Sequence, residues 1–546
     1  MATLHQLRPV SPGASSGNGD IEKSSTVLEK RASADGSSLP ASVLSFRAPL
    51  DTVTERNLLR KIDLHVYPIL FVIYMLSFLD RINISNARIQ GLTEDLDMHG
   101  NDFNIALFVY FIPYILLEIP SNMIIRKFRP STYISTLMMS WGIVNMCMGF
   151  VKTYEALVAL RFLLGVFEAG LMPGIVYLTS MYYKRHEFQT RMSIFFCSTL
   201  VGGAFGGLLA YSISKLGGTA GLAAWQWIFI LEGLATVVVS LAAYFLVVDW
   251  PEECRFLTPY ELALLKQRLE DDNPSYSCSA TTQTSAATAP SSSTRMDTLN
   301  RFTVRLILRD WKIWLASVAY MGIGTTGYAV TFFMPSILLE FGWAAELAQL
   351  YTIPVYAASA ACMVGAAVIS DRLGHRYGFI LAGALASTVG YVILLAQDGG
   401  SSSSSSHAGD AEGTALPRGV KYAAVFLVAV GGYTGTPMCL AWLSNNVSGH
   451  WKRAFSSGIQ VTVGNLAGVI GANIFLAAES PRYPTGYGTA LGMTWIGVAA
   501  ASALFCGLLV ENRKRSRGKR DHRLEGRTEE ELQNMGDWHP LFRFTL

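Results

Sequence analysis

Long apolar blocks separated by short polar joints dominate the chain. A block of roughly 20 mostly apolar residues is long enough for one helix to cross the hydrocarbon core of a bilayer. Twelve blocks reach that length, so we predict an all-α membrane protein with six spans on each side of a polar central segment. The predicted spans cover residues 65–90, 104–126, 131–151, 155–181, 190–214, 225–248, 311–336, 349–370, 377–397, 420–446, 455–478 and 488–510.

The polar segments divide the chain into five parts. We expect a disordered tail over 1–60, because Ser, Gly, Pro and charged residues fill it without an apolar run. Two six-span halves follow at 61–250 and 310–510, joined by a loop at 251–309, and a basic tail covers 511–546. The first residues lack the apolar stretch of a cleavable signal peptide.

The central loop opens with a helix start signal. Thr258 is suited to the N-cap, Pro259 to the first helical position, and Glu261 to closing a capping box. We therefore predict a surface helix here, followed by a flexible Ser/Thr/Ala linker. A second low-complexity linker, with six serines at 401–406, falls between the ninth and tenth spans.

Lysine and arginine are unevenly distributed over the loops between spans, and such residues accumulate on the cytoplasmic side of membrane proteins. One set of loops carries ten of them and the alternate set carries six. The chain segments before the first span and after the last are also basic, so we predict that both termini are cytoplasmic. The plasma membrane is the expected location if the chain is an importer. The ten are Arg126, Lys127, Arg129, Lys184, Arg185, Arg191, Arg372, Arg376, Lys452 and Arg453.

Composition narrows the possible functions. Of the 546 residues 51% are hydrophobic and only 15% are charged, well below the quarter that is typical of soluble proteins. The net charge of +3 gives no indication of nucleic-acid binding. The seven cysteines form no pattern of metal ligands, and the sequence has no GxxxxGK[ST], HExxH or GxSxG motif. We therefore expect neither an enzyme, nor a metal site, nor a cofactor, nor transport driven by ATP on this chain.

Two charged residues fall near the middle of the first span. A charge there costs roughly 2.5–3.5 kcal/mol on insertion scales, so Asp80 and Arg81 should each face a polar cavity or a partner. Neighbouring side chains on a helix point about 100° apart, so the two cannot face the same spot. Asn83 shares the helix face of Asp80. The alternative to a polar cavity is a static ion pair between helices.

The fourth span contains Arg161 and Glu168, seven residues apart on one helix face. Two turns separate them by roughly 10 Å along the axis, too far for a direct pair. Each must meet another helix, a proton or a ligand, unless separate interhelical ion pairs satisfy them.

Other polar residues within the spans are open to more than one interpretation. Asn445 and Asn465 could hydrogen-bond across helices or to a ligand. Glu118, beside Pro120, is interpreted as locally satisfied at a helix kink, and Glu232 as a packing or gating residue. A twelve-span chain with charges inside the membrane and no nucleotide site indicates a secondary transporter.

Several stretches resemble the major facilitator superfamily, and within it the anion:cation symporters, most closely the fungal allantoate-permease-like branch. They include "SFLDRINISNARIQGL" in span 1 and "LRFLLGVFEAGLMPG" in span 4. The superfamily's signature loop is similar to "SDRLGHR" between spans 8 and 9, with Asp371, Arg372, Gly374 and Arg376 as its gating residues.

The resemblance implies a monomer in which two six-helix halves rock about a central site. In related transporters of sugar acids and organic anions, matching arginines hold the substrate carboxylate, which here would be Arg81 and Arg161. The matching Asp80 and Glu168 would take part in proton coupling. Together with Asn83, Asn445 and Asn465 as substrate contacts, these residues predict proton-coupled uptake of a small organic anion such as a carboxylate, a vitamin acid or a ureide.

Two alternatives remain from the sequence. The same fold could export a fungal secondary metabolite. A nutrient sensor without transport is the other, although such receptors usually carry a longer signalling tail than the roughly 36 residues that follow the last span.

Overall fold

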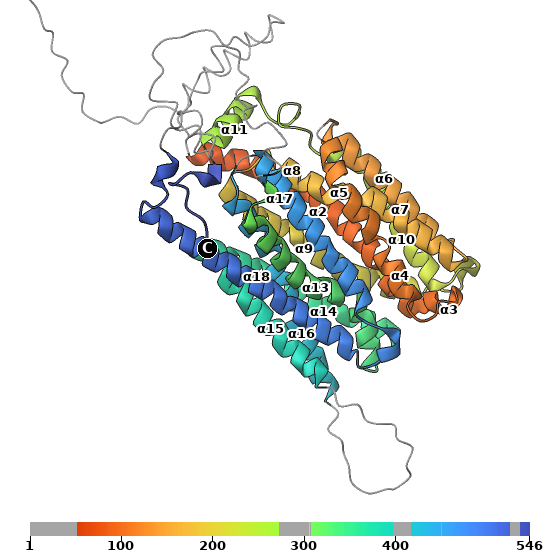
Figure 1. Cartoon of the computed structure of the whole chain (residues 1–546). Helices are drawn as coiled ribbons and strands as arrows, with labels where there is room; N and C mark the ends of the chain where they lie inside the picture. Colours follow the sequence, from red (N-terminus) through yellow and green to blue (C-terminus); the bar gives the residue numbers. More distant parts are fainter. Residues whose placement is uncertain are drawn as a thin grey trace, which may run out of the picture. The chain divides into compact units, whose positions relative to one another are not determined.

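The computed structural model describes residues 52–125, 127–271, 305, 307–396, 416–448, 450–524 and 536–546. The predicted linker after the central-loop helix and the serine run at 401–406 lie outside the described residues. Residues 55–546 form one unit, a bundle of long helices (Figure 1).

The first half of the chain supplies six membrane-crossing elements, as predicted. Two of them are broken: the second span is split near residue 109 and the fourth near residue 169. The first helix is followed by a π-helical turn in which Gly91 adopts φ +96°, a conformation that favours glycine. The helices are α2 (Thr52–Ala87), α3 (Thr93–Asp95), α4 (Asp102–Phe108), α5 (Phe111–Ile125), α6 (Pro130–Met148), α7 (Tyr154–Glu168), α8 (Leu171–Ser180), α9 (Arg185–Ser214) and α10 (Ala224–Leu246).

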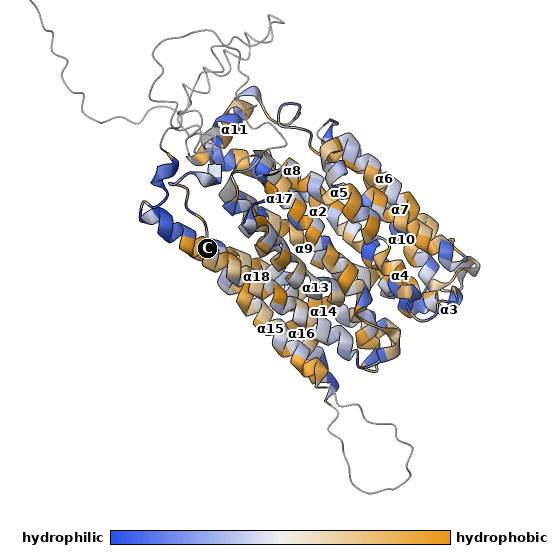
Figure 2. Cartoon of the chain, in the orientation of Figure 1, coloured by the Kyte–Doolittle hydropathy of each residue, from blue (hydrophilic) through white to orange (hydrophobic). Residues whose placement is uncertain are grey.

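The second half supplies the other six, so the predicted all-helical fold with twelve crossing elements is confirmed. Nine helical segments in the described part of the chain are long and apolar enough to cross a membrane; the α4–α5 pair, α6 and α17 do not meet those limits. The helices are α13 (Trp311–Glu340), α14 (Ala345–Leu373), α15 (Tyr377–Leu395), α16 (Arg418–Asn446), α17 (His450–Asn473) and α18 (Pro484–Ser516). Figure 2 shows hydrophobic residues along the bundle and hydrophilic ones gathered near its ends.

The predicted central-loop helix is α11 (Pro259–Asp271). Both hydrogen bonds of its capping box form: Thr258 N donates to Glu261 Oε2 at 2.8 Å and Glu261 N to Thr258 Oγ1 at 3.3 Å. This helix marks one end of the bundle, called here the α11 end, and the opposite end is called the α3 end (Figure 1).

The prediction that residues 1–60 are disordered is wrong for its last part, because α2 already begins at Thr52. Glu55 explains the extension: it pairs with Lys184 at 3.1 Å and with Arg268 of α11 at 2.5 Å. Arg268 is fully buried and also pairs with Glu187. Ion pairs with two other segments therefore fix a stretch whose own composition gives no apolar signal.

The two halves meet along α9 and α14. Gly203 lies so close to the Tyr356 ring that an added Cβ would come within 2.6 Å of it, and at Gly207 a Cβ would lie 2.7 Å from the Gln349 carbonyl oxygen. These glycines therefore allow the helices to approach closely. Near the α3 end, Asn104 Nδ2 also donates to the Phe475 carbonyl at 3.1 Å across the halves.

The segment 536–546 packs against the α11 end of the second half; we call it the C-terminal clasp. Phe544 is buried and joins the hydrophobic core that Trp442 and Leu508 also line. The side-chain amide of Asn446 binds the backbone of Thr545: its Oδ1 accepts from Thr545 N at 2.9 Å and its Nδ2 donates to the Thr545 carbonyl at 3.0 Å. The basic tail predicted from the sequence thus ends in a structured segment.

Candidate functional site

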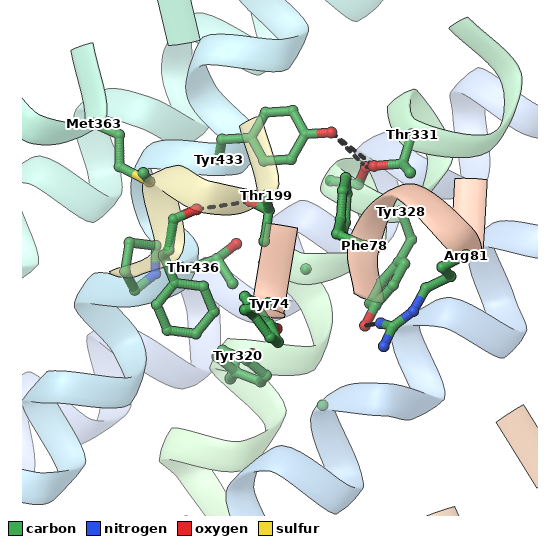
Figure 3. A pocket seen from close by; sticks show the side chains of 15 residues that line it. Tyr74, Phe78, Arg81, Thr199, Tyr320, Tyr328, Thr331, Met363, Tyr433 and Thr436 are labelled. Carbon is green, nitrogen blue, oxygen red and sulfur yellow. Dashed lines mark hydrogen bonds between the residues drawn. The ribbon is translucent and has the colours of Figure 1, made fainter. Parts of the chain in front are cut away.

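A cavity of about 70 Å³ lies between the two halves. Its wall is mostly aromatic and apolar, with hydroxyl groups and a single charged side chain, Arg81 (Figure 3). The first half contributes residues from α2 and α9, and the second half contributes residues from α13, α14, α16 and α17. Polar and aromatic lining residues are Tyr74, Phe78, Phe196, Thr199, Tyr320, Tyr328, Thr331, Tyr433 and Thr436.

Arg81 forms a buried ion pair with Glu168. Its Nη2 lies 2.5 Å from Glu168 Oε1, which also accepts a hydrogen bond from Ser77 Oγ at 2.5 Å. The guanidinium carbon lies 5.1 Å and 5.2 Å from the ring centroids of Tyr110 and Tyr114, within cation–π range. The seven-residue spacing on α7 predicted that Glu168 meets a group outside its own helix, and that group is Arg81.

A chain of polar contacts continues from Arg81 into the second half. Arg81 Nη1 donates to Tyr328 Oη at 3.4 Å, and Tyr328 Oη donates to Asn465 Oδ1 at 3.0 Å. Asn465 Nδ2 then donates to Glu118 Oε2 at 3.2 Å, which also accepts from Thr462 Oγ1 at 3.1 Å. The interpretation that Glu118 is satisfied locally at its helix kink is therefore wrong: its partners lie on α17, in the other half.

Several polar atoms in this series of contacts have no hydrogen-bond partner in the part of the protein that the structure describes. Arg81 Nε, Glu168 Oε2 and Glu118 Oε1 are buried without a hydrogen-bond partner among the described residues. A buried polar atom left unpaired costs about 1–3 kcal/mol, and more if it is charged. Such atoms beside a cavity are suited to a polar ligand or ordered water.

Asp80 faces away from the cavity, into the interior of the first half. Its Oδ1 accepts from Asn145 Nδ2 at 2.7 Å, and its Oδ2 accepts from Thr236 Oγ1 at 2.8 Å and Trp141 Nε1 at 3.2 Å. Asn83 points the same way and faces Glu232 of α10. Asp80 therefore does not line the cavity with Arg81, as the divergence of about 100° between adjacent side chains led us to expect, and Asn83 does not take the place expected of a substrate contact.

Arg161 also lies outside the cavity wall. It is 1% exposed, and both Nη atoms reach the backbone carbonyl of Arg81 at 3.5 Å. That contact places Arg161 behind the helix that carries Arg81, against the backbone and not against the cavity.

Asn445 lies near the end of α16 and contacts the signature loop at the α11 end. With its amide oxygen turned toward the guanidinium of Arg376, it accepts from Nη1 at 2.8 Å and Nη2 at 2.6 Å. Gly374 ends α14 with φ +66°, the left-handed conformation that glycine tolerates best. Arg376 also donates to the Ala441 carbonyl at 3.0 Å and lies 3.9 Å from Asp371, whereas Arg372 is exposed. Asn445 thus contacts the signature loop and not the cavity where a substrate contact was expected.

Of the predicted residues, the structure brings Arg81, Glu168 and Asn465 together, and it adds Tyr328 and Glu118. Tyr328 had a weak signal, as an aromatic residue within a span. Glu118 was recognised as a polar residue within a span, but the cost of a carboxyl in lipid shows only that it needs a polar partner and not which helix supplies it.

Comparison with known proteins agrees with this architecture. The chain is 32% identical to the "MFS-type transporter cnsO" of Penicillium expansum, over 90% of this chain and 91% of that protein. It is 30% identical to the "High-affinity nicotinic acid transporter" of Saccharomyces cerevisiae, over 80% of this chain and 75% of that protein. An inward-facing, unoccupied structure of a bacterial homologue of the human lysosomal transporter Spinster covers 84% of this chain and 97% of its own, with a TM-score of 0.57 and 14% identity, a similarity of fold.

The sequence profile of one transporter family matches residues 70–472, which include all the residues of the cavity wall. With twelve crossing helices in two halves, a cavity between the halves and relatives that are transporters, the chain belongs to the Major Facilitator Superfamily.

Proposed function

We propose that the protein is a proton-coupled importer of a small organic anion, within the anion:cation symporter branch of the superfamily. It works in the plasma membrane with the α11 end and both termini in the cytoplasm, in keeping with the excess of lysine and arginine in the loops at that end. The observation that carries the proposal is the buried, incompletely satisfied Arg81–Glu168 pair beside a cavity between the halves.

Arg81 is the anion-binding group of this proposal. A guanidinium stays charged and offers a planar fork of donors that matches a carboxylate. In the observed state one side of that fork is taken by Glu168, while Nε has no partner among the described residues. An incoming carboxylate therefore competes with Glu168 for the same cation.

The competition couples a proton to the substrate. Once the substrate carboxylate pairs with Arg81, Glu168 would be a buried charge without a cation, which costs several kcal/mol. Binding one proton at a Glu168 oxygen removes that charge. Anion and proton thus occupy the site together, and release of the proton allows the Arg81–Glu168 pair to form again and expel the anion.

The cavity wall favours an aromatic or heteroaromatic acid. Tyr74, Tyr320, Tyr328 and Tyr433 supply ring faces and hydroxyl groups to the cavity wall, and Tyr328 lies beside the Arg81 guanidinium (Figure 3). Aromatic rings pack well on such faces, and the hydroxyls provide directional hydrogen bonds to a ring nitrogen or substituent. The similarity to a nicotinic acid transporter points the same way, so nicotinate is the first substrate to test.

Uptake of radiolabelled nicotinate tests the proposal, in yeast cells that lack their own nicotinate transporter and express either the full chain or an Arg81→Gln variant. We expect uptake to rise as external pH falls, to collapse with a protonophore, and to be absent from the variant. The variant also corrects for passive entry of the neutral acid. Uptake that is indifferent to both treatments would exclude proton coupling, and faster loss of label from preloaded cells would indicate an exporter.

A further inference from the structure

A second buried polar cluster lies inside the first half, away from the cavity. It spans α2 and α10, which run antiparallel, and consists of two facing pairs. Asp80 meets Thr236 through a 2.8 Å hydrogen bond, and one turn further toward the α3 end Asn83 faces Glu232. We call these four residues the α2–α10 ladder.

The ladder is closed to solvent yet poorly satisfied. Asp80 and Asn83 are 0% exposed and Glu232 is 3% exposed. Both oxygens of Glu232 and both amide atoms of Asn83 lack a hydrogen bond of good geometry among the described residues. Native proteins leave few buried polar side-chain atoms unpaired, so four in one place indicate that something small binds there.

The two carboxyl groups of the ladder, Asp80 and Glu232, have no positively charged hydrogen-bond partner among the described residues. Within the described part of the chain, Asp80 accepts only from the neutral donors Asn145, Trp141 and Thr236, and Glu232 lies beside the neutral Asn83. Three charged groups on other helices interact electrostatically with Asp80: Glu168, Arg161 and Glu232 itself.

Glu168 is already paired with Arg81. Arg161 is then the remaining fully buried cation of the described first half, and it donates to a backbone carbonyl. One cation can balance one of the two ladder carboxyls, and the second remains a buried charge that costs several kcal/mol.

We infer that Asp80 and Glu232 together hold one proton, which makes the α2–α10 ladder a proton site separate from the substrate cavity. Glu232 supplies the second carboxyl, and Asn83 and Thr236 position the two groups. The inference deepens the proposed proton coupling: the ladder is a site on the proton's route, one helix face away from the Arg81–Glu168 exchange.

The separation between the two sites has a structural consequence. Asp80 and Arg81 are adjacent on α2, so a small rotation of that helix moves both side chains at once. Loss of the ladder proton would leave two carboxylates about one helical turn apart, on α2 and α10, and repulsion between them would favour such a rotation. A proton in the ladder can therefore influence the cavity without touching the substrate.

Infrared difference spectroscopy on the purified full chain in lipid nanodiscs tests the inference without any substrate. A protonated carboxyl has a C=O stretch that disappears on deprotonation and shifts in ²H₂O. We expect the wild-type protein to lose one such component as pH is raised, and Glu232→Gln and Asp80→Asn each to remove or displace that component. Glu118→Gln and Glu340→Gln, which alter carboxyls on other faces of the bundle, should leave it in place.

Glu232→Asp keeps a carboxyl and should therefore retain the C=O component. If it does, the loss of that component in Glu232→Gln is not caused by misfolding. An unchanged component in folded Glu232→Gln would overturn the inference. So would a component displaced by exchanging potassium for sodium at constant pH, since that result would assign the ladder to a metal cation. Failure of nicotinate uptake would count against the proposed substrate and leave this measurement unaffected.

Discussion

Two clusters of buried charge, one beside the cavity and one under the C-terminal clasp, differ in how completely they are satisfied. Around Asp537, both carboxylate oxygens bind Lys452, at 2.9 and 2.8 Å, and Lys312 lies 2.5 Å from Oδ2. Asp310 adds a second carboxylate, 2.8 Å from Lys452, so two positive and two negative charges balance. The Arg81–Glu168 pair is also neutral, but it borders the cavity, and each partner keeps a buried atom without a hydrogen bond among the described residues.

The difference separates a structural role from a functional one. A closed and neutral ion cluster has nothing to gain from a further ligand, and breaking it costs stability. An open pair at the edge of a cavity can exchange partners at low cost. We therefore expect substitutions in the clasp to change stability and substitutions at Arg81 and Glu168 to change transport.

The largest effect should come from Asp537→Asn. This change leaves two buried lysines facing one remaining carboxylate, and breaking a buried pair costs about 3 kcal/mol or more. Thermal unfolding in detergent should show a clearly lower Tm for this variant, whereas Asp97→Asn, at an exposed carboxyl near the α3 end, should leave Tm unchanged. Equal Tm values for both variants would mean that the clasp does not stabilise the bundle.

Arg81→Gln should weaken substrate binding, whereas Asp537→Asn lowers stability. Hydrogen bonds to a charged group contribute about 1.5–3 kcal/mol, so the variant should lose about 10- to 100-fold in nicotinate affinity. Binding by the purified protein measures this, with Arg60→Gln on the exposed start of α2 as the control. Unchanged affinity in a folded Arg81→Gln variant would remove the guanidinium from the site.

The double variant Arg81→Gln/Glu168→Gln tests whether the ion pair beside the cavity contributes as much to stability as the ion cluster under the C-terminal clasp. Replacing both members of a buried pair by neutral groups is often neutral for stability, whereas Glu168→Gln alone leaves a buried cation unpaired. The double variant should therefore unfold within about 1 kcal/mol of the wild-type protein. A loss as large as that of Asp537→Asn would show that the pair is as structural as the clasp.

The smallest expected effect is the loss, at acid pH, of the stability that Asp537 gives to the C-terminal clasp. Burial alone would raise the pKa of Asp537, but the attraction of Lys312 and Lys452 holds that pKa below its ordinary value. A carboxyl with a lowered pKa in the folded state stabilises fully above the ordinary Asp pKa of about 3.9, and this contribution disappears as pH falls through the lowered value. The Tm difference between wild-type and Asp537→Asn should be constant near neutral pH and shrink below about pH 4. A difference that already shrinks near neutral pH would contradict the lowered pKa.

The sequence was sufficient for the crossing elements, because apolar length is a local property, and for the α11 capping box, whose residues lie within four positions. Contacts between segments far apart in the chain could not be predicted from the sequence. Glu118 meets Asn465 and Thr462 only because α5 and α17 pack across the two halves. Helical periodicity correctly separated Asp80 from Arg81, but nothing local could show that Asp80 faces α6 and α10 while Arg81 faces the cavity.

Glu168→Gln tests the central claim, that Glu168 and the substrate carboxylate exchange at Arg81, most directly. In proteoliposomes we expect this variant to keep nicotinate counterflow, because the neutral amide leaves Arg81 available to the anion. Accumulation driven by a pH gradient should be lost, because the exchanging proton has no acceptor. Wild-type levels of pH-driven accumulation in Glu168→Gln would contradict the account.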